Sequence, residues 1–265
     1  MKCSTMFIRL SVVSLSAMCL ALAIGTHAQA QGVWETKAPM PTATSGPATG
    51  VIASKLYVAT GSFTSALQVY DPASNSWTTR APIPTHRGAP TGGVIDGKLY
   101  VVGGCRFDDC RIGVTTILEM YDPATDTWTT KTPMPTARFA MASGVIAGKL
   151  YVAGGSTSCG ACLGTSTLEV YDPATDTWMT KASMSTARAH TDGAVINGKL
   201  YVVGGTTDNV AGINLATLEV YDPVLDTWTP KASMPTPRIA LGAGQVNGIL
   251  YAVRSEERRV GKECA

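Results

Sequence analysis

One arginine recurs at the same place in successive segments of the chain, as Arg87, Arg138, Arg188 and Arg238. A guanidinium group is planar and can hold a carboxylate or a sulfate through two parallel hydrogen bonds. If the four side chains surround one channel, they form a binding site for an anionic ligand. Alternatively, each arginine packs within its own segment or pairs with a neighbouring aspartate. The first equivalent position holds Thr44.

Four cysteines form a second candidate group, Cys105 with Cys110 and Cys159 with Cys162. Each pair falls in one short segment, which favours two local disulfides in an exported protein. Disulfides between the two segments and a tetrahedral zinc site of four thiolates are the alternatives. A redox pair at Cys159 is disfavoured because a reactive thiol gains from a helix N-terminus, and a strand precedes this segment. We expect disulfides and no bound metal.

The sequence contains few residues that could form a catalytic site. After residue 30 the histidines are His86 and His190, and no nucleophile, base and acid recur together. Two Gly-x-x-x-x-Gly-Lys matches, at 92–98 and 193–199, are followed by Leu and lie in expected hairpins, whereas a phosphate loop opens a helix. Asp122 and Asp126 flank a tight turn, which favours a structural role over calcium binding. We expect no catalytic residue and no cofactor.

The two ends of the chain differ from its middle. Lys2 and Arg9 precede an apolar stretch, and Ala28-Gln29-Ala30 is typical of a signal-peptidase site. Residues 1–30 are therefore expected to be a cleaved signal peptide, which predicts a secreted or periplasmic protein with no membrane span after cleavage; a retained, uncleaved signal is the alternative. Residues 254–265 break the preceding composition and match the translation of a sequencing adapter, so we expect a non-native tail there.

Charge excludes one class of partner. The chain has 21 Lys and Arg against 19 Asp and Glu, and removal of Lys2 and Arg9 leaves 19 of each. Nucleic-acid binding requires a basic field, because phosphate contacts supply most of the affinity. We expect a protein or glycan partner and no nucleic acid.

The residues that could do chemistry are carried by a repeat. The sequence Tyr-Asp-Pro-Ala-Thr-Asp-Thr-Trp stands at 121–128 and 171–178, with a close variant at 221–228. A second motif, Lys-Leu-Tyr-Val-Val-Gly-Gly, stands at 98–104 and 199–205. Each Trp lies 23 residues before the next Leu-Tyr tyrosine, as in Trp34 to Tyr57. The length varies only after Leu-Tyr, so one loop of each repeat is variable.

Each repeat predicts four short strands, which we call a to d. Strand a is small and apolar, and Asp96-Gly97 and its equivalents predict a two-residue hairpin to strand b. Strand b is a continuous apolar run, typical of a strand covered on both faces. A Gly-Gly pair, which permits close backbone approach, follows it. Strand c alternates, Asp-Pro begins the next turn, and strand d carries the Trp.

These motifs resemble the kelch-repeat β-propeller family, over residues 31–253. The resemblance implies an all-β fold of four complete four-stranded blades and a partial fifth, with six or seven blades in the intact protein. It assigns structural roles to the glycine pairs, the c-strand tyrosines and the d-strand tryptophans: Gly103, Gly104, Gly154, Gly155, Gly204, Gly205, Tyr121, Tyr171, Tyr221, Trp128, Trp178 and Trp228.

The predicted function is that of a binding scaffold. Rigid blades present the b–c loops, at 62–67, 105–116, 156–166 and 206–216, on the same face as the d–a loops that carry the arginines. The alternative is an exported sugar-processing enzyme similar to the kelch-fold sialic acid mutarotases, which requires the arginine ring and an acid or base in the channel. The two-histidine copper site of galactose oxidase, a kelch-like enzyme, has no equivalent pattern here.

Overall fold

The computed structural model describes residues 35–61, 64–106, 113–158, 163–208 and 211–253. The chain divides into two units, Met1–Thr36 and Lys37–Ala265. Only Glu35 and Thr36 of the first unit are among the described residues. The expected signal peptide and the expected non-native tail lie outside the described residues.

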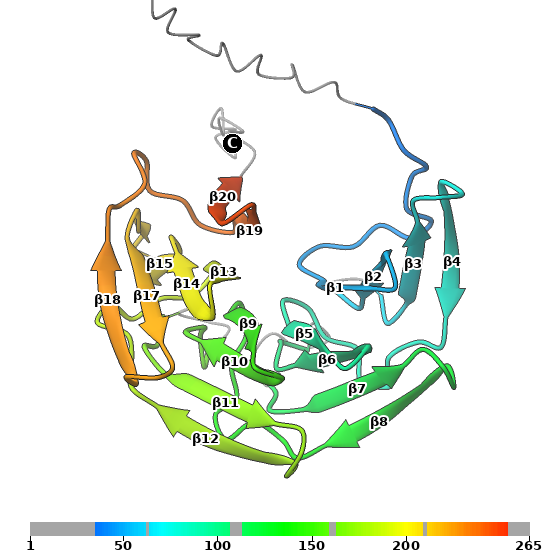
Figure 1. The fold of residues 1–265 in the computed structure, drawn as a ribbon, viewed down its shortest axis with the longest axis horizontal. Coiled ribbons are helices and arrows are strands. Elements are labelled where there is room, and N and C mark those ends of the chain that lie inside the picture. The colour runs from blue at the N-terminus through cyan, green and yellow to red at the C-terminus, as the bar shows by residue number, and fades with distance from the viewer. Residues whose placement is uncertain (1–34, 62–63, 107–112, 159–162, 209–210, 254–265) are drawn as a thin grey trace, which may run out of the picture. The chain divides into compact units, whose positions relative to one another are not determined.

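The second unit consists of successive antiparallel β-sheets, and the described residues contain no helix. Four of the sheets have four strands each, in sequence order from the inside outward (Figure 1). The first blade comprises β1 (Ala48–Ile52), β2 (Lys55–Ala59), β3 (Leu67–Asp71) and β4 (Ser76–Arg80). The second comprises β5 (Thr91–Ile95), β6 (Lys98–Val102), β7 (Leu118–Asp122) and β8 (Thr127–Lys131).

The third and fourth blades repeat this plan. The third comprises β9 (Ala142–Ile146), β10 (Lys149–Ala153), β11 (Leu168–Asp172) and β12 (Thr177–Lys181). The fourth comprises β13 (Asp192–Ile196), β14 (Lys199–Val203), β17 (Leu218–Asp222) and β18 (Thr227–Lys231). Its b–c loop adds a small hairpin of β15 (Thr206–Asp208) and β16 (Ile213–Asn214), and a two-stranded sheet of β19 (Gly242–Val246) and β20 (Ile249–Val253) follows.

The turn between strands a and b has the predicted form. Asp96 and Gly97 both have positive φ, 48° and 72°, as a two-residue hairpin of the primed type requires. The turn after strand c is also as predicted, since Asp122 accepts a hydrogen bond from the Ala124 amide at 2.9 Å. Asp122 also pairs with Lys98 at 2.8 Å, which gives it a structural role.

Strand order explains the burial of each strand. The a strands β1, β5, β9, β13 and β19 line the inside, and the d strands β4, β8, β12 and β18 lie outermost (Figure 1). The b strand β6 is buried from Leu99 to Val102, whereas most of β8 is exposed. The prediction that strand b is covered on both faces is therefore confirmed, as is the all-β propeller fold.

Apolar layers join each blade to the next. Leu99, Val101 and Tyr121 of the second blade are buried in one cluster with Ile52 and Leu67 of the first. Equivalent clusters lie between the second and third blades and between the third and fourth. Tyr121, Tyr171 and Tyr221 are each fully buried at these interfaces.

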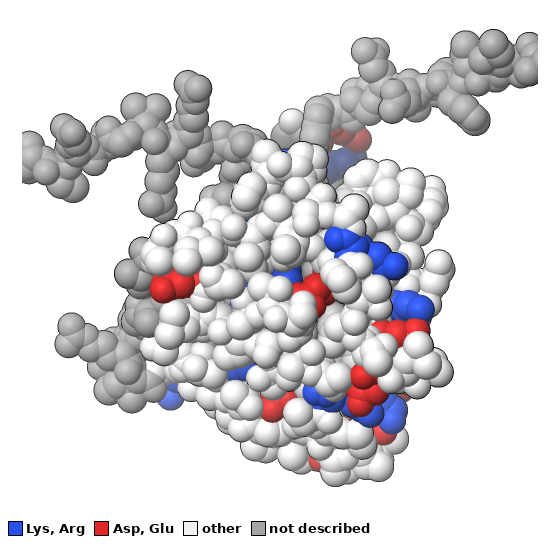
Figure 2. Space-filling model, turned by 90° about the vertical axis from the view of Figure 1, so that its left-hand side faces the viewer, with Lys and Arg blue, Asp and Glu red and all other residues white. Residues whose placement is uncertain are grey.

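The surface carries charges of both signs. On the face drawn in Figure 2, Lys and Arg lie beside Asp and Glu, in small groups. Four lysines at the start of strand b, from Lys55 to Lys199, are paired with the aspartate that ends strand c. No helix of the described residues is long and apolar enough to cross a membrane.

Candidate functional site

The structure places the recurring arginines between blades. Arg87, Arg138 and Arg188 have fully buried side chains. Arg138 donates from Nη2 to Glu169 of β11 at 2.7 Å, and Glu169 accepts a second bond from Thr136 at 2.8 Å. Burial lowers the pKa of Arg138, while the charge of Glu169 opposes that shift. The guanidinium is thus held inside the third blade.

The same pairing occurs in the adjoining blades. Arg87 pairs with Glu119 of β7, and Arg188 pairs with Glu219 of β17 at 2.6 Å. The partner is a glutamate of strand c and not a neighbouring aspartate. These three guanidiniums are enclosed and ion-paired, so the structure favours the packing alternative over an open ring that receives an anion. Arg238 is half-buried and donates to the Ala252 carbonyl at 3.0 Å.

The glycine pairs are needed because the backbone of these arginines packs directly against them and leaves no room for a side chain. The Gly104 amide donates to the Arg138 carbonyl oxygen at 2.9 Å. A Cβ at Gly103 would lie 2.4 Å from that oxygen, and Gly103 has a φ of +64°. The second blade therefore holds the backbone of Arg138, and the third blade holds its side chain.

In the first blade, both the arginine and the glutamate of this ion pair are replaced by other residues. Thr44 stands at the arginine position and Gln68 at the glutamate position. Gln68 is buried and exchanges two hydrogen bonds with the backbone of Thr42, at 2.9 and 3.0 Å. A buried glutamate without its arginine would carry an uncompensated charge, so the joint replacement by neutral side chains is expected.

The b–c and d–a loops lie on one face, as predicted. Gly88 of a d–a loop exchanges two backbone hydrogen bonds of 2.8 Å with Cys105 of a b–c loop. Phe139 with Ser156 and Ala189 with Thr206 repeat the contact. The b–c loops of the third and fourth blades also touch, because the Gly164 amide donates to the Thr207 carbonyl at 3.0 Å. The β15–β16 hairpin was not anticipated from the sequence.

The cysteine predictions fall mostly outside the described residues. Cys105 is buried next to Gly88, and Cys110, Cys159 and Cys162 are not among the described residues. The disulfides therefore stay predictions. Within the described ranges no group of three or more His, Cys, Asp or Glu could hold a metal ion.

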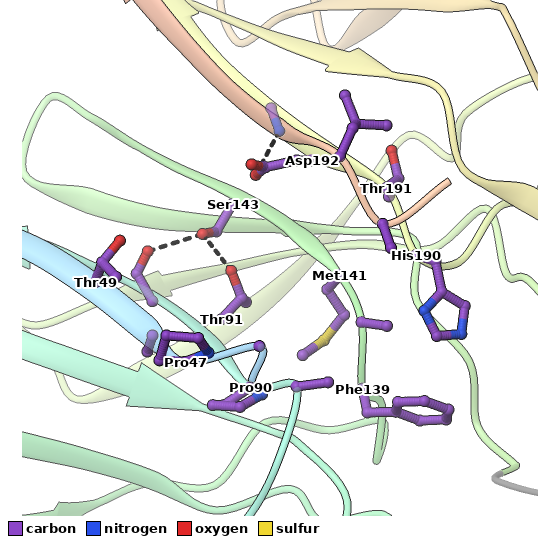
Figure 3. A pocket seen from close by; sticks show the side chains of 18 of the residues that line it. Pro47, Thr49, Pro90, Thr91, Phe139, Met141, Ser143, His190, Thr191 and Asp192 are labelled. Atoms are coloured by element: carbon purple, nitrogen blue, oxygen red, sulfur yellow. Dashed lines mark hydrogen bonds between the residues drawn. The ribbon is translucent and has the colours of Figure 1, made fainter. Parts of the chain in front are cut away.

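A cavity of about 730 Å³ lies among the a strands and the d–a loops. This volume is within the range of small-molecule sites. Slightly more than half of its lining surface is apolar, and Pro47, Pro90, Met141 and Leu241 contribute to it. Figure 3 shows the polar lining side chains, among them the hydroxyls of Thr91 and Ser143 and the carboxylate of Asp192. We call Thr91, Ser143 and Asp192 the polar wall.

The hydroxyls of the polar wall have assigned directions. The Ser143 hydroxyl donates to the Gly92 carbonyl oxygen at 2.8 Å, because a carbonyl can only accept. Its single proton is thereby used. The 2.5 Å contact between Thr91 Oγ1 and Ser143 Oγ is therefore donated by Thr91. Both oxygens keep lone pairs and have no proton left to donate.

Asp192 is the first residue of β13, where the other blades have Ala48, Thr91 and Ala142. Its two oxygens accept the amides of Gly193 at 2.8 Å and Ala243 at 2.7 Å, and the second bond links β13 to β19. Burial raises the pKa of Asp192 to about 6 despite these two donors. No ion pair of Asp192 occurs among the described residues.

His190 lines the cavity two residues before Asp192. His190 has a positive φ of 52°, as do the equivalent residues Ala89, Ala140 and Ala240 of the other d–a loops. Backbone hydrogen bonds connect these four residues around the cavity. Its ring stands edge-on to Phe139, with centroids 5.8 Å apart. Burial lowers the pKa of His190, which keeps it neutral at pH 7, and its Nε2 has no hydrogen-bond partner in the described structure.

Two groups of residues in this region were missed from the sequence. The glutamates of strand c were seen only as part of an alternating strand, although Gln68 replaces one where Thr44 replaces the arginine. Asp192 was not singled out either. An alignment of the a strands would have found it, because it puts a carboxylate at a position that is otherwise small or neutral.

Known proteins with similar repeats match this chain in sequence and in structure. The KLHDC2/KLHL20/DRC7 Kelch-repeats domain matches residues 51–253. The chain belongs to the kelch-repeat family. No curated protein matches this kelch chain. The structure of YjhT is similar with a TM-score of 0.69 at 22% identity, covering 79% of this chain and 72% of YjhT.

A second similar structure is a fungal alcohol oxidase of the AA5 family in complex with copper. Its TM-score is 0.55 at 20% identity, and the match covers 78% of this chain and 57% of the oxidase. At these identities both likenesses show the kelch fold alone, so the function is argued from this chain's own residues.

Proposed function

We propose that this kelch propeller is an exported, non-enzymatic binding module whose b–c and d–a loops present a surface to a protein or glycan ligand. The observation that carries the proposal is the joining of the two loop sets on one face, as between Gly88 and Cys105. Loops of variable length on a repeated scaffold are where binding residues concentrate. The cavity lies among the same d–a loops and supplies a concave centre.

The sugar-processing alternative has less support. It requires open guanidiniums around the channel, and Arg87, Arg138 and Arg188 are buried in ion pairs. Asp192 could act as an acid or base, but no second catalytic group contacts it in the described structure. A binding role needs only the surface and the cavity.

The test is a glycan array and a partner capture with the full chain, each repeated on a loop variant. The variant shortens the b–c loop 206–216 to the length of 62–67, which the first blade already accommodates. Loss of ligand binding with an unchanged unfolding midpoint supports the proposal. Asp96→Asn, in the a–b hairpin where other blades have Asn197 and Asn247, is the matched control. Turnover of a bound sugar, followed by NMR, would replace the proposal by the enzymatic alternative.

We also propose local disulfides, Cys105 with Cys110 and Cys159 with Cys162. Cys105 lies in the same b–c loop as Cys110, at the contact with Gly88, which supports the first pairing. Such bridges fit an exported protein and would close two of the loops that form the proposed surface. Peptide mapping of the non-reduced protein tests both pairings.

A further inference from the structure

The polar wall offers only hydrogen-bond acceptors to the cavity, whereas the Thr49 hydroxyl of β1, which also lines the cavity but lies outside this group, can donate. The Ser143 proton is donated to the Gly92 carbonyl and the Thr91 proton to Ser143, so both hydroxyls offer lone pairs to the cavity. Thr191, which also lines the cavity, donates its proton to the Val203 carbonyl at 2.9 Å. An ionised Asp192 adds two further acceptor oxygens. A ligand that meets this wall must therefore bring the donors.

The cavity also holds a charge without a counter-ion. Its lining residues include Asp192 and no lysine, arginine or glutamate. Burial keeps His190 neutral at pH 7. Two backbone amides fix the carboxylate in place but supply no full positive charge. A desolvated carboxylate with a lone pair on each oxygen favours a cationic donor.

We propose that this cavity binds a lysine side chain of a protein ligand, with its ammonium group at Asp192 and its methylene groups along the apolar lining. The inference rests on the proposed binding function and narrows its ligand. An ammonium group has three donors, which match the carboxylate and the hydroxyl oxygens of Thr91 and Ser143. Figure 3 shows Asp192 and Ser143 on the same part of the wall, from the neighbouring strands β13 and β9.

The rest of the cavity fits the lysine stem. Pro47, Pro90, Met141 and Leu241 provide apolar surface, and the methylene groups of lysine readily pack on such surface. The d–a loops that carry Ala89 and Ala140 also line the cavity, so a side chain from a ligand on the loop face can reach it. An amino sugar carries the same ammonium group but lacks the flexible stem.

The experiment uses n-butylammonium, which reproduces the lysine side chain, with n-butanol as its neutral analogue. Binding to the full chain at pH 7.5 is followed by NMR titration, for the natural protein, Asp192→Asn and Asp96→Asn. We expect butylammonium to bind the natural protein and Asp96→Asn equally. Asp192→Asn should weaken it by about tenfold or more, which is the usual loss when a hydrogen bond to a charged group is removed.

A pH change provides a second readout that needs no variant. With a pKa of about 6, Asp192 is ionised at pH 7.5 and mostly protonated at pH 5, so binding should weaken roughly tenfold. His190 is the other lining group that could gain charge, and the same titration on Asp192→Asn isolates its contribution. The packed strands β9 and β19 carry no titratable side chain, and β20 carries Tyr251. Strand β14 carries Tyr201 and Lys199, and Lys199 is paired with Asp222.

Several results would overturn the inference. They are equal binding of butanol, undiminished binding to Asp192→Asn, no binding of butylammonium, or binding of D-glucosamine in its place. A partner captured by the loop face without any response to butylammonium would leave the binding function standing and remove only the lysine assignment. A lysine peptide that binds, and loses binding when its Nε is acetylated, supports the assignment in a natural ligand.

Discussion

The indole N–H of Trp128 in β8 donates to the carbonyl oxygen of Ala81 in the preceding blade, over 2.8 Å. The amide of the same Ala81 donates to Asp126 at 3.0 Å, and Asp126 also accepts the hydroxyl of Tyr121 at 2.6 Å. Both backbone groups of one residue are thus bound by the next blade. The arrangement recurs at Trp77 with Ala38, Trp178 with Thr132 and Trp228 with Ala182.

The first prediction removes that indole donor. Trp128→Phe keeps an aromatic ring on β8 but leaves the Ala81 carbonyl without its partner. We expect the free energy of unfolding to fall by about 1–2 kcal/mol, the usual cost of a lost hydrogen bond with its unpaired acceptor. Urea denaturation measures it. Thr129→Ser, at the exposed neighbouring residue, should change stability by less than about 0.5 kcal/mol. A Trp128→Phe protein as stable as the natural one would contradict the interpretation.

The second prediction concerns the buried pair of Arg138 and Glu169. Arg138→Met leaves the glutamate buried without a counter-ion, so we expect a loss of about 3–5 kcal/mol. Replacement of both residues, by Met and Gln, should recover part of that loss, as Gln68 already stands at the equivalent position of the first blade. Urea denaturation of the two single variants and the double variant gives the coupling.

The control for this pair is an exposed one. Lys149 lies 2.7 Å from Asp172 at the surface, where water screens the charges. Lys149→Met should therefore cost far less than Arg138→Met. Equal losses in the two proteins would show that burial does not set the value of the Arg138 pair.

The sequence predicted the repeated elements because their signals are local. Asp96-Gly97 requires positive φ at two successive residues, and the structure has it. The tyrosine and tryptophan positions follow from strand alternation in the same way. The Glu169 partner of Arg138 lies 31 residues away, so it depends on how strands pack within a blade and is not a local property.

The polar wall of the cavity could not be predicted from the sequence, because it also depends on contacts between distant residues. The direction of the Thr91 hydroxyl depends on Ser143 in the next blade, and the pKa of Asp192 depends on its burial. The recurring arginines were candidates for ligand binding because their residue type suits anions, with packing inside a blade as the alternative. Only the three-dimensional arrangement shows their pairing with glutamates.

The third prediction separates crowding from backbone strain at glycine. Gly154 and Gly148 have similar positive φ values, 68° and 72°. A Cβ at Gly154 would lie 2.6 Å from the Arg188 carbonyl oxygen, whereas a Cβ at Gly148 meets nothing within 4 Å. Gly148→Ala should cost about 1 kcal/mol, from φ alone, and Gly154→Ala about 3 kcal/mol or more. Similar thermal unfolding of the two variants would show that the Arg188 carbonyl can move.

The last prediction is the pH dependence of stability that Asp192 confers. Its pKa is raised from 3.8 to about 6 on folding, so the folded protein binds more protons than the unfolded chain between these values. Stability should therefore fall as pH rises from 4 to 7, by about 1–3 kcal/mol. His190 acts in the opposite sense, because its lowered pKa makes the folded protein release protons that the unfolded chain keeps.

The difference between the natural protein and Asp192→Asn isolates the aspartate, because His190 contributes to both. Urea denaturation from pH 4 to 7.5 should show this difference falling as pH rises and levelling off above about pH 7. The carboxyls whose pKa is lowered, such as Asp126 and Asp222, contribute mainly below this range. A difference that does not vary with pH would show that folding does not raise the pKa of Asp192, and the basis for placing an ammonium group beside a desolvated carboxylate would be lost.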